Sequence, residues 1–240
     1  MESLAGTNRF PWSFRPVSRP FSGRLKVVET LWIRASEQLM ALAGQVRDLE
    51  QVDFEIDAQR LQAAGQAARQ AFARLEAQCL TLLAQEELRP TQRVLLAALL
   101  RNSSCFQNVL TCLQRLGTRM TVIRDQHPPL ALMQLHELGS EALGMLGRSL
   151  EAFKSLDPSL ARAVLDQETW AIYLTRTFHS RAARALFLDV DNLEWITECH
   201  SVVHHWEGIV ASAKVMAHEV LRLHTEIPHS YSSSAQILVQ

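Results

Sequence analysis

The sequence has 240 residues, of which 48% are hydrophobic, and its 24 basic and 25 acidic side chains leave a formal net charge of -1. This balance excludes a global field that would draw the chain onto nucleic acid or an anionic membrane. The length and the apolar content are sufficient for a continuous core, in one large domain or in two small ones.

Cysteine usage and hydropathy indicate the compartment. The four cysteines (Cys79, Cys105, Cys112 and Cys199) show neither C-x-x-C pairing nor the density of a secreted disulfide framework, so we expect reduced, buried thiols. No apolar run approaches the roughly 20 residues that cross a bilayer, and the N-terminus has no apolar signal segment. The sequence therefore predicts a cytoplasmic protein.

The two ends differ in composition from the rest. Residues 1–20 have no acidic residue after Glu2, and three arginines lie there among aromatic side chains. Such a segment is either a disordered leader or an arm that adheres to a partner or a membrane surface. We expect a flexible arm over residues 1–20 and a flexible tail over residues 228–240. The arginines and aromatics of the arm are Arg9, Phe10, Trp12, Phe14, Arg15 and Arg19.

Proline positions predict the helices between these ends, because an interior proline costs a helix about 3 kcal/mol. The proline-free stretches are rich in Ala, Leu, Gln, Glu and Arg, which favour helix, and none alternates with the period of a strand. The sequence predicts an all-α protein with helices over residues 21–51, 53–86, 90–124, 130–155, 158–187 and 191–226.

Two of these helices carry a start signal in the sequence. Asp157-Pro158 has the residue types of an N-cap followed by proline at the first helical position, and Asp191 with Glu194 has those of a capping box. The helix over residues 90–124 has apolar side chains at steps of three and four, which predicts one buried stripe.

An internal repeat appears when the third and sixth predicted helices are compared at an offset of 100 residues. Phe106 then falls on Trp206, and Val109 falls on Ile209. We therefore expect two tandem three-helix bundles related by an internal repeat, with bounds of 21–126 and 127–227.

Catalytic motifs are absent from the sequence: it has no phosphate-binding glycine loop, G-x-S-x-G elbow, H-E-x-x-H or dinucleotide fingerprint. Candidate metal ligands occur at one place. His200, His204 and Glu207 are spaced so that all three can face one way on a helix, as a zinc-like ion requires. An ordinary half-buried helix face explains the same spacing. We predict no enzyme activity and no cofactor.

At this point three segments, each within a predicted helix or at its edge, resemble those of a known family, the PhoU proteins of phosphate-specific transport. The resemblance extends from about Phe21 to Thr225 and implies two three-helix bundles in tandem. The matching segments are RPTQRVLLAALL (Arg89–Leu100), LEAFKSLD (Leu150–Asp157) and LARAVLDQETWAIYLTRTF (Leu160–Phe178).

The family also has a signature, an acid-x-x-x-Asp pair in each half, whose carboxylates can bridge hard cations. This chain departs from it. The first copy has Gln107 and Thr111 at the acid positions, and the second keeps Glu207 but has Ala211 in place of Asp. With three of the four carboxylates replaced, we expect no metal site of the family type.

The resemblance implies a regulator that dampens phosphate uptake and starvation signalling. Its partners would be the ATPase of a phosphate ABC transporter and a membrane sensor histidine kinase, with no nucleic acid. It would act in the cytoplasm and reach the inner membrane through those partners. We also expect a homodimer, because long apolar stripes on three-helix bundles often leave an exposed seam. Two alternatives stay open: a metal-binding bundle that uses His200, His204 and Glu207, and a divergent helical adaptor with another partner.

Overall fold

The computed structural model describes residues 19–48, 58–85, 88–126, 129–188 and 193–226. Within these ranges the protein consists of six α-helices and contains no strand, which confirms the predicted all-α class. Five of the six helices begin and end within a few residues of the predicted positions; for the second, predicted to begin at residue 53, residues 53–57 lie outside the described ranges. The helices are α1 (Arg19–Asp48), α2 (Ala58–Leu83), α3 (Pro90–Gln126), α4 (Pro129–Ser155), α5 (Pro158–Leu188) and α6 (Leu193–Glu226).

The start of α5 follows the predicted cap. A side-chain oxygen of Asp157 accepts hydrogen bonds from the backbone N–H of Ser159 at 2.7 Å and of Leu160 at 3.4 Å, and Pro158 is the first helical residue. The cap satisfies two backbone donors that the helix itself leaves unpaired. The other predicted start signal includes Asp191, which lies outside the described residues.

The turn between α4 and α5 is tight because one residue adopts a left-handed conformation. Leu156 has a φ of 50°, and the N–H of Asp157 donates to the carbonyl oxygen of Ala152 at 3.0 Å. This is the hydrogen bond of a Schellman-type helix end, where glycine is the usual residue. The turn reverses the chain at once, so α4 and α5 lie antiparallel and in contact.

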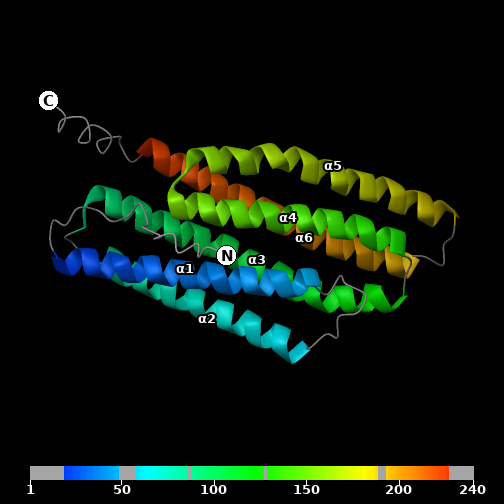
Figure 1. The fold of residues 1–240 in the computed structure, drawn as a ribbon, viewed down its shortest axis with the longest axis horizontal. Helices are drawn as coiled ribbons and strands as arrows, with labels where there is room; N and C mark the ends of the chain where they lie inside the picture. The colour runs from blue at the N-terminus through cyan, green and yellow to red at the C-terminus, as the bar shows by residue number, and fades with distance from the viewer. Residues whose placement is uncertain (1–18, 49–57, 86–87, 127–128, 189–192, 227–240) are drawn as a thin grey trace, which may run out of the picture.

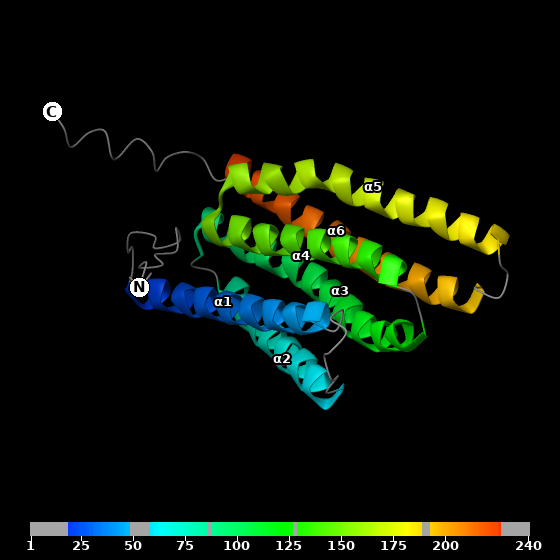
Figure 2. The same ribbon diagram turned by 45° about the vertical axis from the view of Figure 1, so that its right-hand side comes forward.

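The six helices form two antiparallel groups of three, α1–α3 and α4–α6 (Figures 1 and 2). Within each group, consecutive helices run in opposite directions and pack on one another. The groups meet where α3 packs along α6 and where α1 contacts α4. None of the described helices is apolar enough over a sufficient length to span a bilayer.

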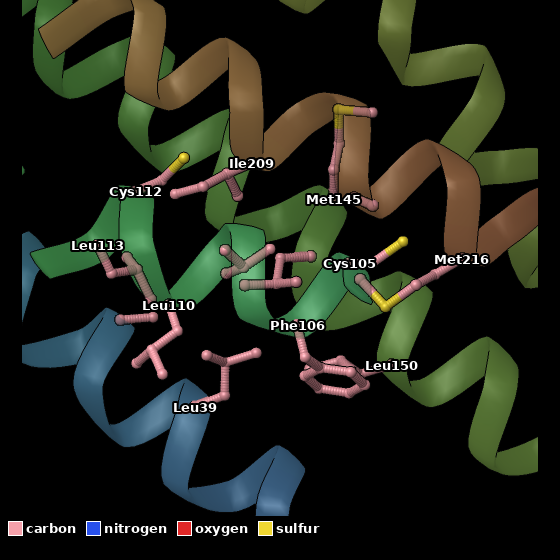
Figure 3. Packing of buried hydrophobic residues seen from close by; sticks show 14 of the residues in the cluster. Leu39, Cys105, Phe106, Leu110, Cys112, Leu113, Met145, Leu150, Ile209 and Met216 are labelled. Carbon is pink, nitrogen blue, oxygen red and sulfur yellow. The ribbon is translucent and has the colours of Figure 1, made fainter. Parts of the chain in front are cut away.

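Buried side chains from both groups form one hydrophobic core. Trp32 of α1 packs against Phe106 of α3 and Phe153 of α4, with ring centroids 4.8 and 4.6 Å away, and the ring centroid of Phe72 of α2 lies 4.0 Å from that of Phe106. Figure 3 shows residues of α1, α3, α4 and α6 pointing into the same space, among them Leu39, Phe106, Leu150 and Ile209.

The predicted domain bounds stay predictions. The boundary between residues 126 and 127 falls at the edge of the described ranges, as do most of the arm over residues 1–20 and all of the tail over residues 228–240. Helix α1 begins at Arg19, inside the segment predicted as an arm.

Candidate functional site

The four positions that correspond to the family signature all lie on exposed helix faces. On α3, the side-chain amide of Gln107 donates to Glu76 of α2 at 3.3 Å. The hydroxyl of Thr111 donates to the backbone carbonyl of Gln107 at 2.8 Å. On α6, Glu207 and Ala211 are exposed. Of the four positions only Glu207 carries a carboxylate, and the first copy instead contacts the carboxylate of Glu76 on α2.

Glu76 is already engaged by two donors. Besides Gln107, the hydroxyl of the buried Ser103 donates to the same Glu76 oxygen. These two hydrogen bonds hold the Glu76 carboxylate in place, but the donors are neutral, and bridging a hard cation requires a second carboxylate. The first copy is thus organised as a polar contact between α2 and α3.

The residues beside the signature positions join the two halves of the molecule. The side-chain amide of Asn108 donates to the carbonyl oxygen of Gly208 at 3.2 Å and to the hydroxyl of Ser212 at 2.9 Å. One turn further along α3, the helices approach so closely that a Cβ placed on Gly208 would lie 2.8 Å from the sulfur of Cys112.

This contact agrees with the internal repeat. At the repeat offset of 100 residues, Asn108 corresponds to Gly208 and Cys112 corresponds to Ser212. The contact between Asn108 and Ser212 therefore corresponds to the contact between Gly208 and Cys112. Because each contact from α3 to α6 has an equivalent contact from α6 to α3, an approximate two-fold axis relates these two antiparallel helices. The signature positions therefore flank the centre of the α3–α6 interface.

Ion pairs lie at both ends of the same interface. Arg101 of α3 donates to Glu219 of α6 at 2.6 Å, and Arg119 of α3 pairs with Glu198 of α6. Glu219, which also pairs with Arg222, is almost buried. Burial raises the pKa of Glu219 to about 7, and the neighbouring Glu226 adds to the rise. The carboxylate is therefore ionised in mildly alkaline solution.

The predicted metal ligands differ in their surroundings. His200 is half-buried and stacks on His179 of α5, with ring centroids 4.8 Å apart and an interplanar angle of 13°. It also makes an edge-to-face contact with Phe178, with ring centroids 5.5 Å apart. Burial, with the neighbouring His179, lowers the pKa of His200, which favours the neutral ring. His204 and Glu207 are exposed.

No group of three or more His, Cys, Asp or Glu side chains among the described residues is placed to hold a metal ion. His179 is a second imidazole beside His200, but among the described residues no third donor completes a metal site with the two. The alternative of a metal site at His200, His204 and Glu207 stays a prediction, to be decided by metal analysis of the purified protein.

The four cysteines are buried and reduced, and burial raises the pKa of Cys79 and of Cys199 to about 12. Because the thiolate is the reactive species, we expect Cys79 and Cys199 to alkylate about 1,000-fold more slowly at pH 8 in the folded protein than in urea. Mass spectrometry of iodoacetamide-treated peptides measures both rates. Equal rates in the two conditions would contradict the burial of these thiols.

Sequence reasoning missed the polar contacts of the α3–α6 interface. The sequence did contain a sign of the Asn108 contact, because the polar Asn108 and the small Gly208 occupy corresponding positions of the repeat. The stacking of His179 on His200 had no such signal, because both residues lie in the second half of the chain and the repeat does not relate them.

No family model matches the sequence, and no curated protein matches it. Among solved structures, the chain is similar to PhoU from Pseudomonas aeruginosa, with a TM-score of 0.79 and 15% identity over 86% of this chain and 99% of that one. It is also similar to the phosphate transport system regulatory protein PhoU from Streptococcus pneumoniae, with a TM-score of 0.72 and 16% identity over 86% of this chain and 97% of that one. The chain therefore has the fold of the PhoU proteins, and the six helices of its described ranges form two tandem bundles.

Proposed function

We propose that this protein is a PhoU-like regulator of phosphate transport and of phosphate-starvation signalling, which acts by binding other proteins and not by catalysis. The observation that carries the proposal is the similarity in fold over nearly the whole length of two PhoU structures, one of them described as a regulatory protein of phosphate transport. The absence of catalytic motifs from the sequence supports binding as the mode of action.

The proposed partners are the ATPase of a phosphate ABC transporter and a membrane sensor histidine kinase, with negative regulation of uptake. A rigid bundle of long helices presents extended faces that suit recognition of other helices and domains. Binding would take place in the cytoplasm and, through these partners, at the inner membrane.

Deletion of the gene tests the proposal in cells grown with abundant phosphate. We expect phosphate uptake to rise and a starvation reporter to switch on, and both to return to normal when the intact gene is restored. Unchanged uptake and reporter output in the deletion strain would refute the phosphate proposal and leave the fold unaffected.

The replaced carboxylates favour one alternative, a divergent adaptor that keeps the bundle and binds another partner. Three of the four signature positions carry a neutral side chain here, and all four are exposed. Co-purification of the tagged chain with a transporter ATPase supports the regulator, and its absence together with a normal deletion phenotype supports the adaptor.

Restoring the acids is expected to restore metal binding. Gln107→Glu, Thr111→Asp and Ala211→Asp together recreate two acid pairs on exposed faces, and the first of these substitutions replaces the hydrogen bond to Glu76 by a second carboxylate beside it. We expect the triple variant to bind divalent or ferric ions that the natural sequence does not bind. Elemental analysis after dialysis measures this. The control is Gln107→Ala with Thr111→Ala, which recreates no acid pair, and equal metal content in all three proteins would contradict the prediction.

A further inference from the structure

Polar contacts between α3 and α6 recur at an interval of seven residues. Arg101 of α3 donates to Glu219 of α6 at 2.6 Å. Seven residues further along α3, the side-chain amide of Asn108 donates at 2.9 Å to Ser212, which lies seven residues before Glu219. Seven residues make about two turns of a helix, so the same faces of α3 and α6 meet again at each interval. At both of these levels of the interface, a donor on α3 faces an acceptor on α6.

The next level places two basic side chains opposite each other. Seven residues beyond Asn108 on α3 is Arg115, and seven residues before Ser212 on α6 is His205. Arg115 is exposed, whereas His205 is only 7% exposed. Among the described residues, neither Arg115 nor the ring of His205 has a hydrogen-bond or ion-pair partner. This level therefore lacks the carboxylate or hydroxyl group that completes the other two.

Electrostatic effects agree with this placement of Arg115. Burial lowers the pKa of His205, and the positive charge of Arg115 lowers it further. His204 and Arg119 add smaller effects in the same direction. Burial also raises the pKa of the Cys112 thiol, and Arg115 acts against that rise. The guanidinium group of Arg115 therefore lies over the α3–α6 interface, close to His205 and to Cys112.

The internal repeat shows that the fold does not require basic side chains at this level. At the offset of 100 residues, Arg115 corresponds to Val215 and His205 corresponds to Cys105. Cys105 is buried and Val215 is 53% exposed, so the equivalent level of the interface consists of a thiol and an aliphatic side chain. The packing of α3 on α6 therefore does not account for Arg115 and His205.

The acidic side chains of α6 near this level do not compensate the pair. Glu198, seven residues before His205, pairs with Arg119 of α3. Glu207 is exposed and lies two residues from His205, which is about 200° of helix rotation and places it on nearly the opposite side of α6. An acceptor for Arg115 and His205 must therefore come from outside the described part of the chain.

We infer that Arg115 and His205 together bind a small tetrahedral oxyanion, such as inorganic phosphate, at this level of the α3–α6 interface. The planar guanidinium group can donate two parallel N–H groups to two oxygens of such an anion. The imidazole ring supplies a further N–H, in its neutral form as well as in its charged form. The anion would complete this level as the carboxylate of Glu219 completes the level of Arg101. Because Arg115 is exposed, the anion can enter directly from solvent.

The choice of phosphate among oxyanions rests on the proposed function, whereas the site itself rests on the residues of the interface. Helices α3 and α6 belong to different three-helix groups, so a bound anion would bridge the two halves of the molecule. Occupancy would then strengthen the contact between the halves when phosphate is abundant. A regulator of phosphate transport could detect its signal in this way.

An NMR titration of the purified full chain with inorganic phosphate at neutral pH tests the inference, with sodium chloride adjusted to keep the ionic strength constant. We expect the ring resonance of His205 and the guanidinium resonance of Arg115 to follow one saturable curve, with a dissociation constant of about 1 mM or below. Arg115→Gln removes the charge at an exposed position and should raise the dissociation constant by at least about tenfold. His205→Leu identifies the ring resonance by its loss and should also weaken binding.

Arg162→Gln is the matched control, because Arg162 is an exposed arginine near the start of α5. It should leave the dissociation constant unchanged, and circular dichroism should show the same helix content in all variants. Shifts that do not saturate, or that chloride alone reproduces, indicate charge screening and overturn the inference. An unchanged dissociation constant in Arg115→Gln overturns it as well.

Failure of this site and failure of the proposed function give different results. A purified chain that binds no phosphate, from a strain whose deletion switches on the starvation reporter, overturns the site and leaves the regulator. A chain that binds phosphate through Arg115, although deletion changes neither uptake nor reporter output, supports the site and refutes the proposed function.

Discussion

Replacing Trp32 by alanine is expected to lower the free energy of unfolding by about 3–5 kcal/mol. Trp32 is 1% exposed and contacts both Phe106 and Phe153, so its removal leaves a cavity between α1, α3 and α4. The cavity lies where the two groups of helices meet, and the surrounding rings can refill it only in part. Urea unfolding, followed by circular dichroism, measures the change.

Trp170→Ala is the control for this prediction. The same side chain is removed, but from a surface where it is 47% exposed, so we expect a loss below about 1 kcal/mol. Similar losses for Trp32→Ala and Trp170→Ala would contradict the central position of Trp32 in the core.

The second large effect is expected from Gly208→Ala. The added methyl group would lie 2.8 Å from the buried sulfur of Cys112, so α3 and α6 must move apart or the thiol must rotate. Overpacking of this kind costs about 1–3 kcal/mol. The same substitution at Gly44 of α1, where nothing lies within 4 Å of the new methyl group, should stabilise the helix by about 0.5–1 kcal/mol. The two glycine variants should therefore differ in sign.

A double-mutant cycle identifies the cause of the Gly208→Ala loss. Cys112→Ala removes the sulfur that the methyl group would meet, so the double variant should be more stable than the sum of the two single changes indicates. Strict additivity of the two changes would show that the loss arises elsewhere, for example at Asn108, whose amide nitrogen lies 3.8 Å from the added Cβ.

Local signals were enough to predict the helices. Proline and the apolar periodicity predicted six helices, and the cap formed by Asp157 begins α5 at the predicted residue. These features depend on residues within one or two turns of each other, which is why they can be read from one sequence. The internal repeat at an offset of 100 residues was also predicted, and in the structure Asn108 and Gly208, which correspond at this offset, lie at equivalent places in the α3–α6 interface.

Contacts between distant segments were not predictable in the same way. Arg101 and Glu219 are 118 residues apart, and nothing in either helix alone indicates that they pair. His200 was predicted as a candidate metal ligand together with His204 and Glu207, but their spacing on one helix gave no indication that His200 stacks on His179 of α5. Which neighbour a helix face meets depends on packing, and spacing within the helix does not determine it.

The approximate two-fold axis through the α3–α6 contact has a consequence for the origin of the molecule. Two three-helix units that exchange equivalent residues across an antiparallel interface are arranged as the subunits of a symmetric dimer are. Gene duplication and fusion of such a subunit yields one chain with this geometry. After fusion each copy can change separately, so Asn108 and Ser212 can form a hydrogen bond where Cys112 and Gly208 make only close contact.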